Sequence, residues 1–300
     1  MTAELLIVGA GPCGVSAALW AKSLGLQPLL LERGARAGGQ LLNVHFVPTN
    51  VATAATGVGT SLAARLGEQL EEMGVQVRYH AEVAALESGA TLRLSDGARL
   101  ESRAVLIASG VRRRHLGIPG ERELEGRGLT YSATQDRASL AGEDVAVIGG
   151  GDAAFENALL LAAAGSRVTV VVRATPRARA EFRQRVAVDP RIEVLEHTRV
   201  IAIEGAARVE QVVVMGDRGR FPLPVGGVVV KVGVLPNSEW CAGAVERDAE
   251  GYVKVDPALA TSRPNVWAAG DITRPSVLGV AVAAGQGAVA VAGIRAALRG

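Results

Sequence analysis

The sequence LLIVGAGPCGVSAALWAKSLGLQPLLLE at residues 5–32 has the order of a βαβ unit. An apolar run over 5–8 ends at GAGPCG (9–14), and small and apolar residues then continue at helical spacing. A second apolar run over 28–31 ends at an acidic residue, Glu32. Strand, tight turn, helix, strand and terminal acid are together typical of a dinucleotide-binding site, whereas the glycine pattern alone would be weak evidence.

Each glycine and the acid in this pattern have their own physical task. Gly9 permits the tight turn, Gly11 lets the backbone approach a pyrophosphate, and Gly14 allows close contact between helix and strand. The first N–H groups of the helix can donate to phosphate oxygens. Glu32 is expected to accept hydrogen bonds from ribose hydroxyls.

A second copy of the pattern occurs in the middle of the chain. Residues 145–148, VAVI, lead into GGGDAA at 149–154, a helical run and a valine-rich strand over 167–173. Where the first copy has Glu32, the second has Val172, which is followed by Arg173. A carboxylate would repel an adenosine 2′-phosphate and an arginine would bind it, so the second site favours NADPH and the first FAD or NAD.

Composition is consistent with two nucleotide-binding domains. The 300 residues are enough for two domains and are 49% hydrophobic, and the formal net charge of +2 gives a nucleic-acid partner no electrostatic support. Apolar strand sequence begins by Glu4, so we expect no signal peptide and a cytoplasmic protein. Residues 277–294 are the most membrane-like, but Gln286 interrupts them, and we expect a buried helix.

Further motifs follow in a fixed order along nearly the whole chain. They are GAGPCG (9–14), GGQL (38–41), AVLIASG (104–110), GIPGE (117–121), YSATQD (131–136), VIGGGDAA (147–154), KVGVLPN (231–237) and VWAAGDI (266–272). This series resembles the low-molecular-weight thioredoxin reductases, the class II pyridine nucleotide-disulfide oxidoreductases. The resemblance implies an α/β fold of two Rossmann-like, three-layer ββα domains, the second inserted in the first, and a homodimer.

The resemblance also implies domain boundaries and cofactor-binding residues. FAD is expected in residues 1–112 with 243–300, and NAD(P)H in residues 113–242. Gly270 and Asp271 would hold the ribityl-phosphate end of FAD, and the helix that follows would aim its N-terminus at the flavin. The expected FAD residues are Gly9, Gly11, Pro12, Cys13, Gly14, Glu32, Arg33, Gly39, Gln40, Leu41, Val83, Ser109, Gly110, Gly270, Asp271 and Val280. The expected NAD(P)H residues are Gly149, Gly151, Asp152, Ala153, Ala154 and Arg173.

Three departures from the family pattern affect the expected chemistry. Residues 132–135 read SATQ where those reductases carry the dithiol CATC, so electrons cannot leave the flavin by the usual disulfide. The HRR motif of the family reads VRA at 172–174, so Arg177 or Arg179 could substitute for the missing arginine, or the nucleotide site could be weak. The Arg-Gln before the final helix reads LG at 278–279, which changes contacts near the flavin.

Cys13 and Cys241 are the chain's two cysteines, too few for a disulfide framework. Cys13 lies at a helix N-terminus, where the helix dipole and free N–H groups are expected to lower the thiol pKa and suit it to reducing small disulfides. The alternative is that Cys13 fills a tight turn as a small residue. We expect Cys241 to be structural, and the four histidines show no metal-ligand spacing, so no metal is expected.

The sequence therefore predicts an FAD-dependent NAD(P)H oxidoreductase without thioredoxin reductase activity. Hydride would pass from nicotinamide to flavin, and the electrons would go to a small disulfide, a quinone, a redox protein or oxygen. The alternative from another functional class is a flavin-binding redox sensor or assembly protein without turnover.

Overall fold

The computed structural model describes residues 3–44, 51, 57–217 and 219–299, which form two compact units. Unit 1 comprises Met1–Arg112 and Leu235–Gly300, and unit 2 comprises Arg113–Val234. The chain returns to unit 1 at Leu235 rather than at the expected residue 243, because Cys241 is fully buried in the core of unit 1. Unit 2 is thus an insertion within unit 1, and each unit is described separately below.

The sheet of unit 1 is centred on the first strand of the chain. Its order is β3-β2-β1-β6-β5-β4, and β17 also pairs with β6. The strands are β1 (Ala3–Val8), β2 (Pro28–Leu31), β3 (Gln76–Arg78), β4 (Val83–Leu86), β5 (Thr91–Leu94), β6 (Arg99–Ile107) and β17 (Val266–Ala268). Val8 is in register with Leu31 on one side and with Ile107 on the other. The carboxyl ends of three parallel strands therefore meet where the first glycine turn begins.

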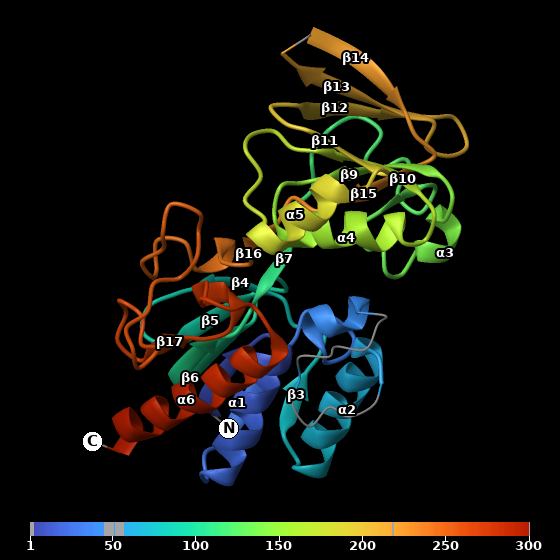
Figure 1. Cartoon of the computed structure of the whole chain (residues 1–300). Helices are drawn as coiled ribbons and strands as arrows, with labels where there is room; N and C mark the ends of the chain where they lie inside the picture. Colours follow the sequence, from blue (N-terminus) through green and yellow to red (C-terminus); the bar gives the residue numbers. More distant parts are fainter. Residues whose placement is uncertain (1–2, 45–50, 52–56, 218, 300) are drawn as a thin grey trace. The chain divides into compact units, whose positions relative to one another are not determined.

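Alternating side chains of β1 divide the core of unit 1 into two faces. Leu5 and Ile7 pack with the helices, whereas Leu6 and Val8 pack with β4 and β5. The helices are α1 (Pro12–Ser23), α2 (Gly59–Glu72) and α6 (Val280–Arg299), with the short helices η1 (Gly39–Asn43), η2 (Glu239–Cys241) and η3 (Asp271–Thr273). This gives a helix layer, a parallel layer and an antiparallel β layer (Figure 1).

Helix α6 is apolar and packs against α1. Among the described helices it is the one long and apolar enough to span a membrane, with a mean hydropathy of 1.5. A Cβ on Gly287 would lie 2.3 Å from the Cys13 carbonyl oxygen, and Ser16 Oγ donates to the Ala284 carbonyl oxygen at 2.7 Å. One face of α6 is therefore part of the core of unit 1.

Unit 2 repeats the three-layer arrangement around the second glycine turn. Its parallel sheet has the order β11-β10-β9-β15-β8, and a separate antiparallel sheet has the order β12-β13-β14. The strands are β8 (Leu129–Thr130), β9 (Asp144–Ile148), β10 (Arg167–Val171), β11 (Ile192–Leu195), β12 (Arg199–Glu204), β13 (Gln211–Gly216), β14 (Gly219–Pro224) and β15 (Gly227–Val230). The helices are α3 (Arg137–Leu140), α4 (Asp152–Ala162) and α5 (Ala180–Val188).

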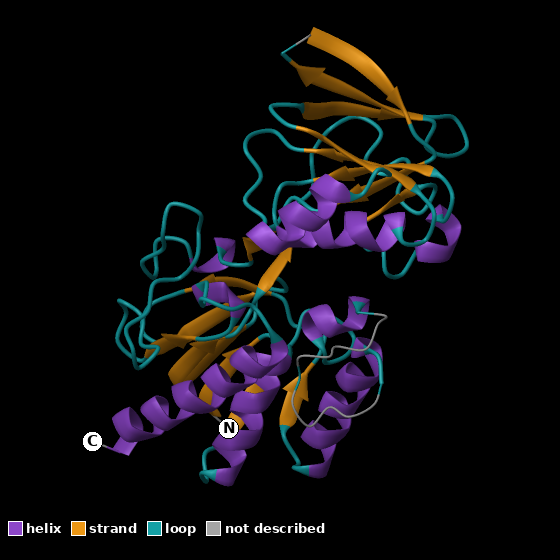
Figure 2. Ribbon diagram, in the orientation of Figure 1, coloured by secondary structure: helices purple, strands orange, loops and turns teal. Residues whose placement is uncertain are grey.

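Burial along β9 accounts for these layers. Val145 and Val147 face α4 and α5, whereas Ala146 and Ile148 face β12–β14 (Figures 1 and 2). At the two crossings between units, β7 (Val111–Arg113) pairs with β16 (Val234–Pro236). The expected fold class, two Rossmann-like domains of three-layer ββα type, is confirmed.

Candidate functional site

The first glycine turn in unit 1 has two positions that are closed to any side chain and one that is open. Gly9 has a φ of +105°, and a Cβ there would lie 2.5 Å from the Ala108 carbonyl oxygen. A Cβ on Gly14 would lie 1.8 Å from the Gly9 carbonyl oxygen. Gly11, the N-cap of α1, has ordinary extended dihedrals, and the nearest atom to its added Cβ is Gly39 Cα at 3.8 Å. The space above the helix start is therefore open at Gly11.

Glu32 holds the turn through both carboxylate oxygens. Oε2 accepts from the Ala10 N–H at 2.9 Å, and Oε1 accepts from the Gly34 N–H at 2.7 Å. A carboxylate has about four lone-pair sites, so each oxygen can still accept a ribose hydroxyl. Glu32 is thus a support of the turn as well as a candidate ligand, a role that sequence reasoning missed. The neighbouring Arg33 is exposed to solvent.

A glycine-rich loop and Asp271 approach the same turn. The Gly38 N–H donates to the Ala10 carbonyl oxygen at 2.8 Å, and a Cβ on Gly39 would lie 2.9 Å from Gly11 Cα. Gln40 Nε2 lies 3.5 Å from Asp271 Oδ2. The next residue of this loop, Leu41, is buried. The loop is thereby fixed against the turn from the side opposite Glu32.

Asp271 offers an acceptor that the described residues leave without a partner. Its Oδ1 is buried and makes no hydrogen bond within the described part of the chain. Burial also raises the pKa of this carboxyl group. Buried polar atoms in folded proteins are nearly always paired, so an orphaned acceptor beside an open glycine turn fits a ligand hydroxyl. Together with the N–H groups at the start of α1, these residues fit the ribityl and pyrophosphate groups of FAD.

Cys13 is buried between Gly270 and α6, and the expected low pKa of its thiol is wrong. Burial raises the pKa of Cys13 to about 12, and the nearby Asp271 carboxylate contributes to the rise. A Cβ on Gly270 would lie 3.2 Å from Cys13 Sγ. Desolvation outweighs the helix N-terminus here, because a thiolate at this depth would lose its hydration. The geometry supports the packing interpretation of Cys13.

The other expected FAD residues occupy two kinds of position. Ser109 is clamped to Asn237: its Oγ donates to the Asn237 carbonyl oxygen, and Asn237 Nδ2 donates to the Ser109 carbonyl oxygen, both at 2.8 Å. Gly110 follows directly, with a φ of +61°. Val83 lies in the apolar core on β4, and Val280 is the half-buried first residue of α6.

Two contributors to this part of the site were not predicted, Asn237 and Gln286. Gln286 Oε1 accepts from the Gly270 N–H at 2.8 Å and so fixes the Gly270–Asp271 turn to α6. A polar residue within an otherwise apolar helix was the available signal for Gln286. Asn237 closes the motif KVGVLPN, which pointed to the region but not to the clamp.

The second glycine turn, in unit 2, repeats the pattern of closed and open positions. Gly149 has a φ of +142°, and a Cβ there would lie 2.2 Å from the Lys231 carbonyl oxygen. Gly151, the N-cap of α4, has extended dihedrals, and its Cβ would meet nothing within 4 Å. Ala153 and the buried Ala154 follow in the first turn of α4. The turn and the free N–H groups of α4 therefore fit a pyrophosphate in the same way.

The arginines near this turn have different tasks. Arg179 donates to Asp152 twice, from its main-chain N–H and from Nε, both at 2.7 Å, and its guanidinium lies over the Phe182 ring. It is therefore engaged with Asp152 and is a poor substitute for the missing arginine of the family. Arg173 follows the buried Val172 at the end of β10, with its side chain exposed.

Residues 132–135, at the position where thioredoxin reductases carry the dithiol, form an ordered turn on α4. The Ala133 N–H donates to Asn157 Oδ1 at 3.1 Å, and Ala133 is fully buried. The N–H groups of Gln135 and Asp136 both donate to the Ser132 carbonyl oxygen at 3.1 Å. The turn thus keeps a fixed shape without sulfur.

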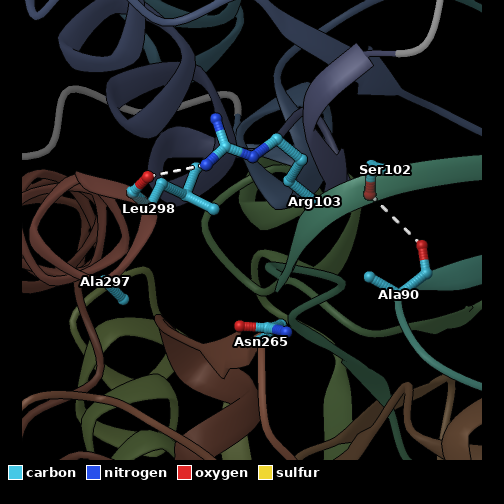
Figure 3. Close-up of a pocket in the computed structure, with 6 residues that line it drawn as sticks. All are labelled: Ala90, Ser102, Arg103, Asn265, Ala297 and Leu298. Atoms are coloured by element: carbon cyan, nitrogen blue, oxygen red, sulfur yellow. Dashed lines mark hydrogen bonds between the residues drawn. The ribbon is translucent and has the colours of Figure 1, made fainter. Parts of the chain in front are cut away.

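A depression of about 390 Å³ in unit 1 lies away from the first glycine turn. Its lining residues are Ala90, Ser102, Arg103, Asn265, Ala297 and Leu298 (Figure 3). Arg103 donates to the Leu298 carbonyl oxygen at 2.6 Å, and Ser102 Oγ donates to the Ala90 carbonyl oxygen at 3.2 Å. Ligands of open α/β sheets bind at the carboxyl ends of the parallel strands, whereas Ser102 and Arg103 lie in the half of β6 remote from its carboxyl end.

Comparisons with known proteins agree with the two turns. The family model "Pyridine nucleotide-disulphide oxidoreductase" matches residues 3–287. An NADH dehydrogenase of Bacillus subtilis is 34% identical over 298 residues, covering 97% of this chain and 57% of that protein. A thioredoxin reductase of Peptoclostridium litorale is 33% identical, covering 96% of this chain and 94% of that protein. The chain thus spans just over half the length of the first curated relatives it matches.

The fold comparison gives the same family. The crystal structure of Lactococcus lactis thioredoxin reductase matches with a TM-score of 0.84 and 29% identity, covering 99% of both chains. The resemblance to low-molecular-weight thioredoxin reductases is thereby confirmed. With a family model over most of its length and relatives above 30% identity, the chain belongs to the pyridine nucleotide-disulphide oxidoreductase family.

Proposed function

We propose that the chain is an FAD-dependent NAD(P)H oxidoreductase that passes electrons to an acceptor other than a thioredoxin-type disulfide. The observation that carries the proposal is the combination of two open glycine turns with an ordered but thiol-free turn at residues 132–135. The cysteines of this chain are Cys13 and Cys241, which are far apart in sequence and both buried. The chain therefore has the framework for both cofactors but no CxxC dithiol.

In this proposal each unit binds one cofactor. Unit 1 binds FAD through the open space at Gly11, the Glu32 carboxylate and Asp271 Oδ1, which has no partner within the described residues. Unit 2 binds NAD(P)H at the N-terminus of α4, next to Gly151. When bound, the two cofactors supply hydride transfer from nicotinamide to flavin. The chain's own residues bind and orient them, and the N-terminus of α6 would favour negative charge nearby.

The state of Cys13 narrows the proposed acceptor. Thiol–disulfide exchange requires a thiolate, and a buried thiol with a pKa of about 12 stays protonated at neutral pH. We therefore favour direct transfer from reduced flavin to a quinone, a redox protein or oxygen, and place a small disulfide reached through Cys13 last. The relatives' names include an NADH dehydrogenase of Bacillus subtilis and an alkyl hydroperoxide reductase of Pseudomonas putida, which supports an acceptor other than thioredoxin.

The proposed nucleotide is NADPH, because Arg173 lacks a neighbouring acid at the position where Glu32 stands in unit 1. Arg173→Ala should remove most of the preference for NADPH and leave NADH kinetics nearly unchanged. Equal use of NADPH and NADH by the wild type would contradict this assignment.

An anaerobic titration of the purified chain with NADPH and NADH tests the proposed function. The protein should be yellow, and its flavin absorbance should bleach at a rate that supports turnover. Yellow protein that neither nucleotide bleaches would favour the redox-sensor or assembly role, and colourless protein that FAD cannot reconstitute would refute the proposal. A homodimer and a cytoplasmic location remain predictions.

A further inference from the structure

Lys231 places an ammonium group at the carboxyl end of β15, beside the second glycine turn. Its main-chain N–H donates to the Ile148 carbonyl oxygen at 2.8 Å, and its own carbonyl oxygen faces Gly149. Its Nζ donates to the Tyr131 carbonyl oxygen at 2.6 Å, just after the end of β8. The side chain therefore spans the ends of strands on one side of β9.

Sheet order shows which half of a dinucleotide would approach this lysine. In unit 2, β9 lies between β10 on one side and β15 on the other. The residue that recognises the adenosine ribose stands at the end of the strand corresponding to β10, where Arg173 follows Val172. A pyrophosphate centred on the N-terminus of α4 then directs the nicotinamide half toward β15 and β8. Lys231 lies on that side.

The surroundings of Lys231 leave its charge only partly compensated. Burial lowers the pKa of Lys231 to about 8, and Arg113 on β7 lowers it too, while Glu156 on α4 raises it. An ammonium has three donors, and the Tyr131 carbonyl oxygen accepts one of them. A half-buried cation beside another cation is stabilised by an approaching anion, because the anion offsets both the lost hydration and the repulsion.

We propose that Lys231 binds the nicotinamide-side phosphate of the nucleotide, so that a cation engages each half: Arg173 the adenosine half and Lys231 the nicotinamide half. The inference rests on the proposed nucleotide site and adds a residue outside its glycine turn. Because both NADPH and NADH contain this phosphate, Lys231 contributes to affinity without discriminating between them. Arg173, in contrast, acts on NADPH alone.

Calorimetric titration of the full-length chain tests this assignment. The variants are Lys231→Met, Lys231→Arg and the matched control Lys254→Met, which removes an exposed lysine of unit 1 that lies 3.9 Å from Glu246. Lys231→Met should weaken NADPH and NADH by the same factor, on the order of tenfold, which corresponds to about 1.4 kcal/mol. Binding of adenosine 2′,5′-bisphosphate, which lacks the nicotinamide half, should stay within about twofold of wild type, since tenfold is 1.4 kcal/mol. Lys231→Arg should recover part of the loss, and Lys254→Met should match wild type.

Each contrary result has a distinct meaning. A Lys231→Met variant that binds both dinucleotides as wild type does overturns the inference and leaves the proposed function intact. Equal loss of adenosine 2′,5′-bisphosphate binding, with a lowered unfolding temperature, would show that Lys231 only supports the fold of unit 2 and would also overturn it. Wild-type protein that binds neither dinucleotide would overturn the proposed function itself.

Discussion

Gly11→Ala should yield a folded protein that has lost its flavin. The added methyl group would lie 3.8 Å from Gly39 Cα, an ordinary van der Waals distance, and the Gly11 dihedrals of −77° and −177° suit alanine. Gly→Ala at a compatible position stabilises by roughly 0.4–1 kcal/mol, and the poorer N-cap offsets part of that gain. We therefore expect the free energy of unfolding of the flavin-free protein to stay within about 1 kcal/mol of wild type.

The same methyl group should be costly for FAD. It would occupy the point at which the backbone approaches the pyrophosphate, so the phosphates must withdraw from the N–H groups of α1. A hydrogen bond to a charged group contributes about 1.5–3 kcal/mol, so loss of one such bond weakens binding by about tenfold to 150-fold. The assay combines the FAD-to-protein absorbance ratio with FAD titration of the apoprotein and urea unfolding.

Two further glycines provide matched controls for this experiment. Gly67→Ala on α2 meets nothing within 4 Å and lies outside the proposed site, so it should keep its flavin. Gly14→Ala should fail to fold normally, because its methyl group would lie 1.8 Å from the Gly9 carbonyl oxygen. Wild-type FAD affinity in folded Gly11→Ala protein would refute the placement of the pyrophosphate, and unfolding of that variant would refute the claim that the site is open.

Three other predictions concern single side chains. Glu32→Ala should lower the free energy of unfolding of the apoprotein by about 2–3 kcal/mol in urea denaturation, because the Ala10 and Gly34 N–H groups lose a charged acceptor; an unchanged midpoint would contradict the supporting role. Cys13→Ser should match wild type with every acceptor, whereas selective loss of small-disulfide reduction would restore a redox role for Cys13. The NADPH dissociation constant should rise as pH increases through about 8, since Lys231 is charged below its pKa and neutral above it; Lys231→Arg should abolish this dependence over the same pH range, and a wild type with a flat profile would count against it.

Local patterns in the sequence were sufficient to predict both βαβ units. Strand, turn and helix lie within about 30 residues, and the tasks of Gly9, Gly11 and Gly14 follow from short-range geometry, which agrees with the space around each Cβ. The three-layer arrangement followed from the resemblance, and burial along β1 and β9 shows its physical basis.

Features that depend on contacts distant in sequence were not predictable in this way. The pKa of Cys13 depends on burial by Gly270 and α6, which no property of residues 9–14 reveals. Arg179 was a candidate for the nucleotide phosphate until the structure placed it on Asp152. The return of the chain at Leu235 depends on where η2 packs.

The turn at residues 132–135 shows how chemistry can change on an unchanged framework. Its anchors are the Asn157 side chain, the Ser132 carbonyl oxygen and the hydrogen bond between Thr130 and Asp136. None of these groups is a thiol, so serine and glutamine can stand in the turn without loosening it. Binding of two cofactors depends on glycine geometry and helix N-termini that the whole fold maintains, whereas the exit of electrons depends on a few replaceable side chains. For this reason the fold assigns the chain to a redox family, and the acceptor has to be argued from the site.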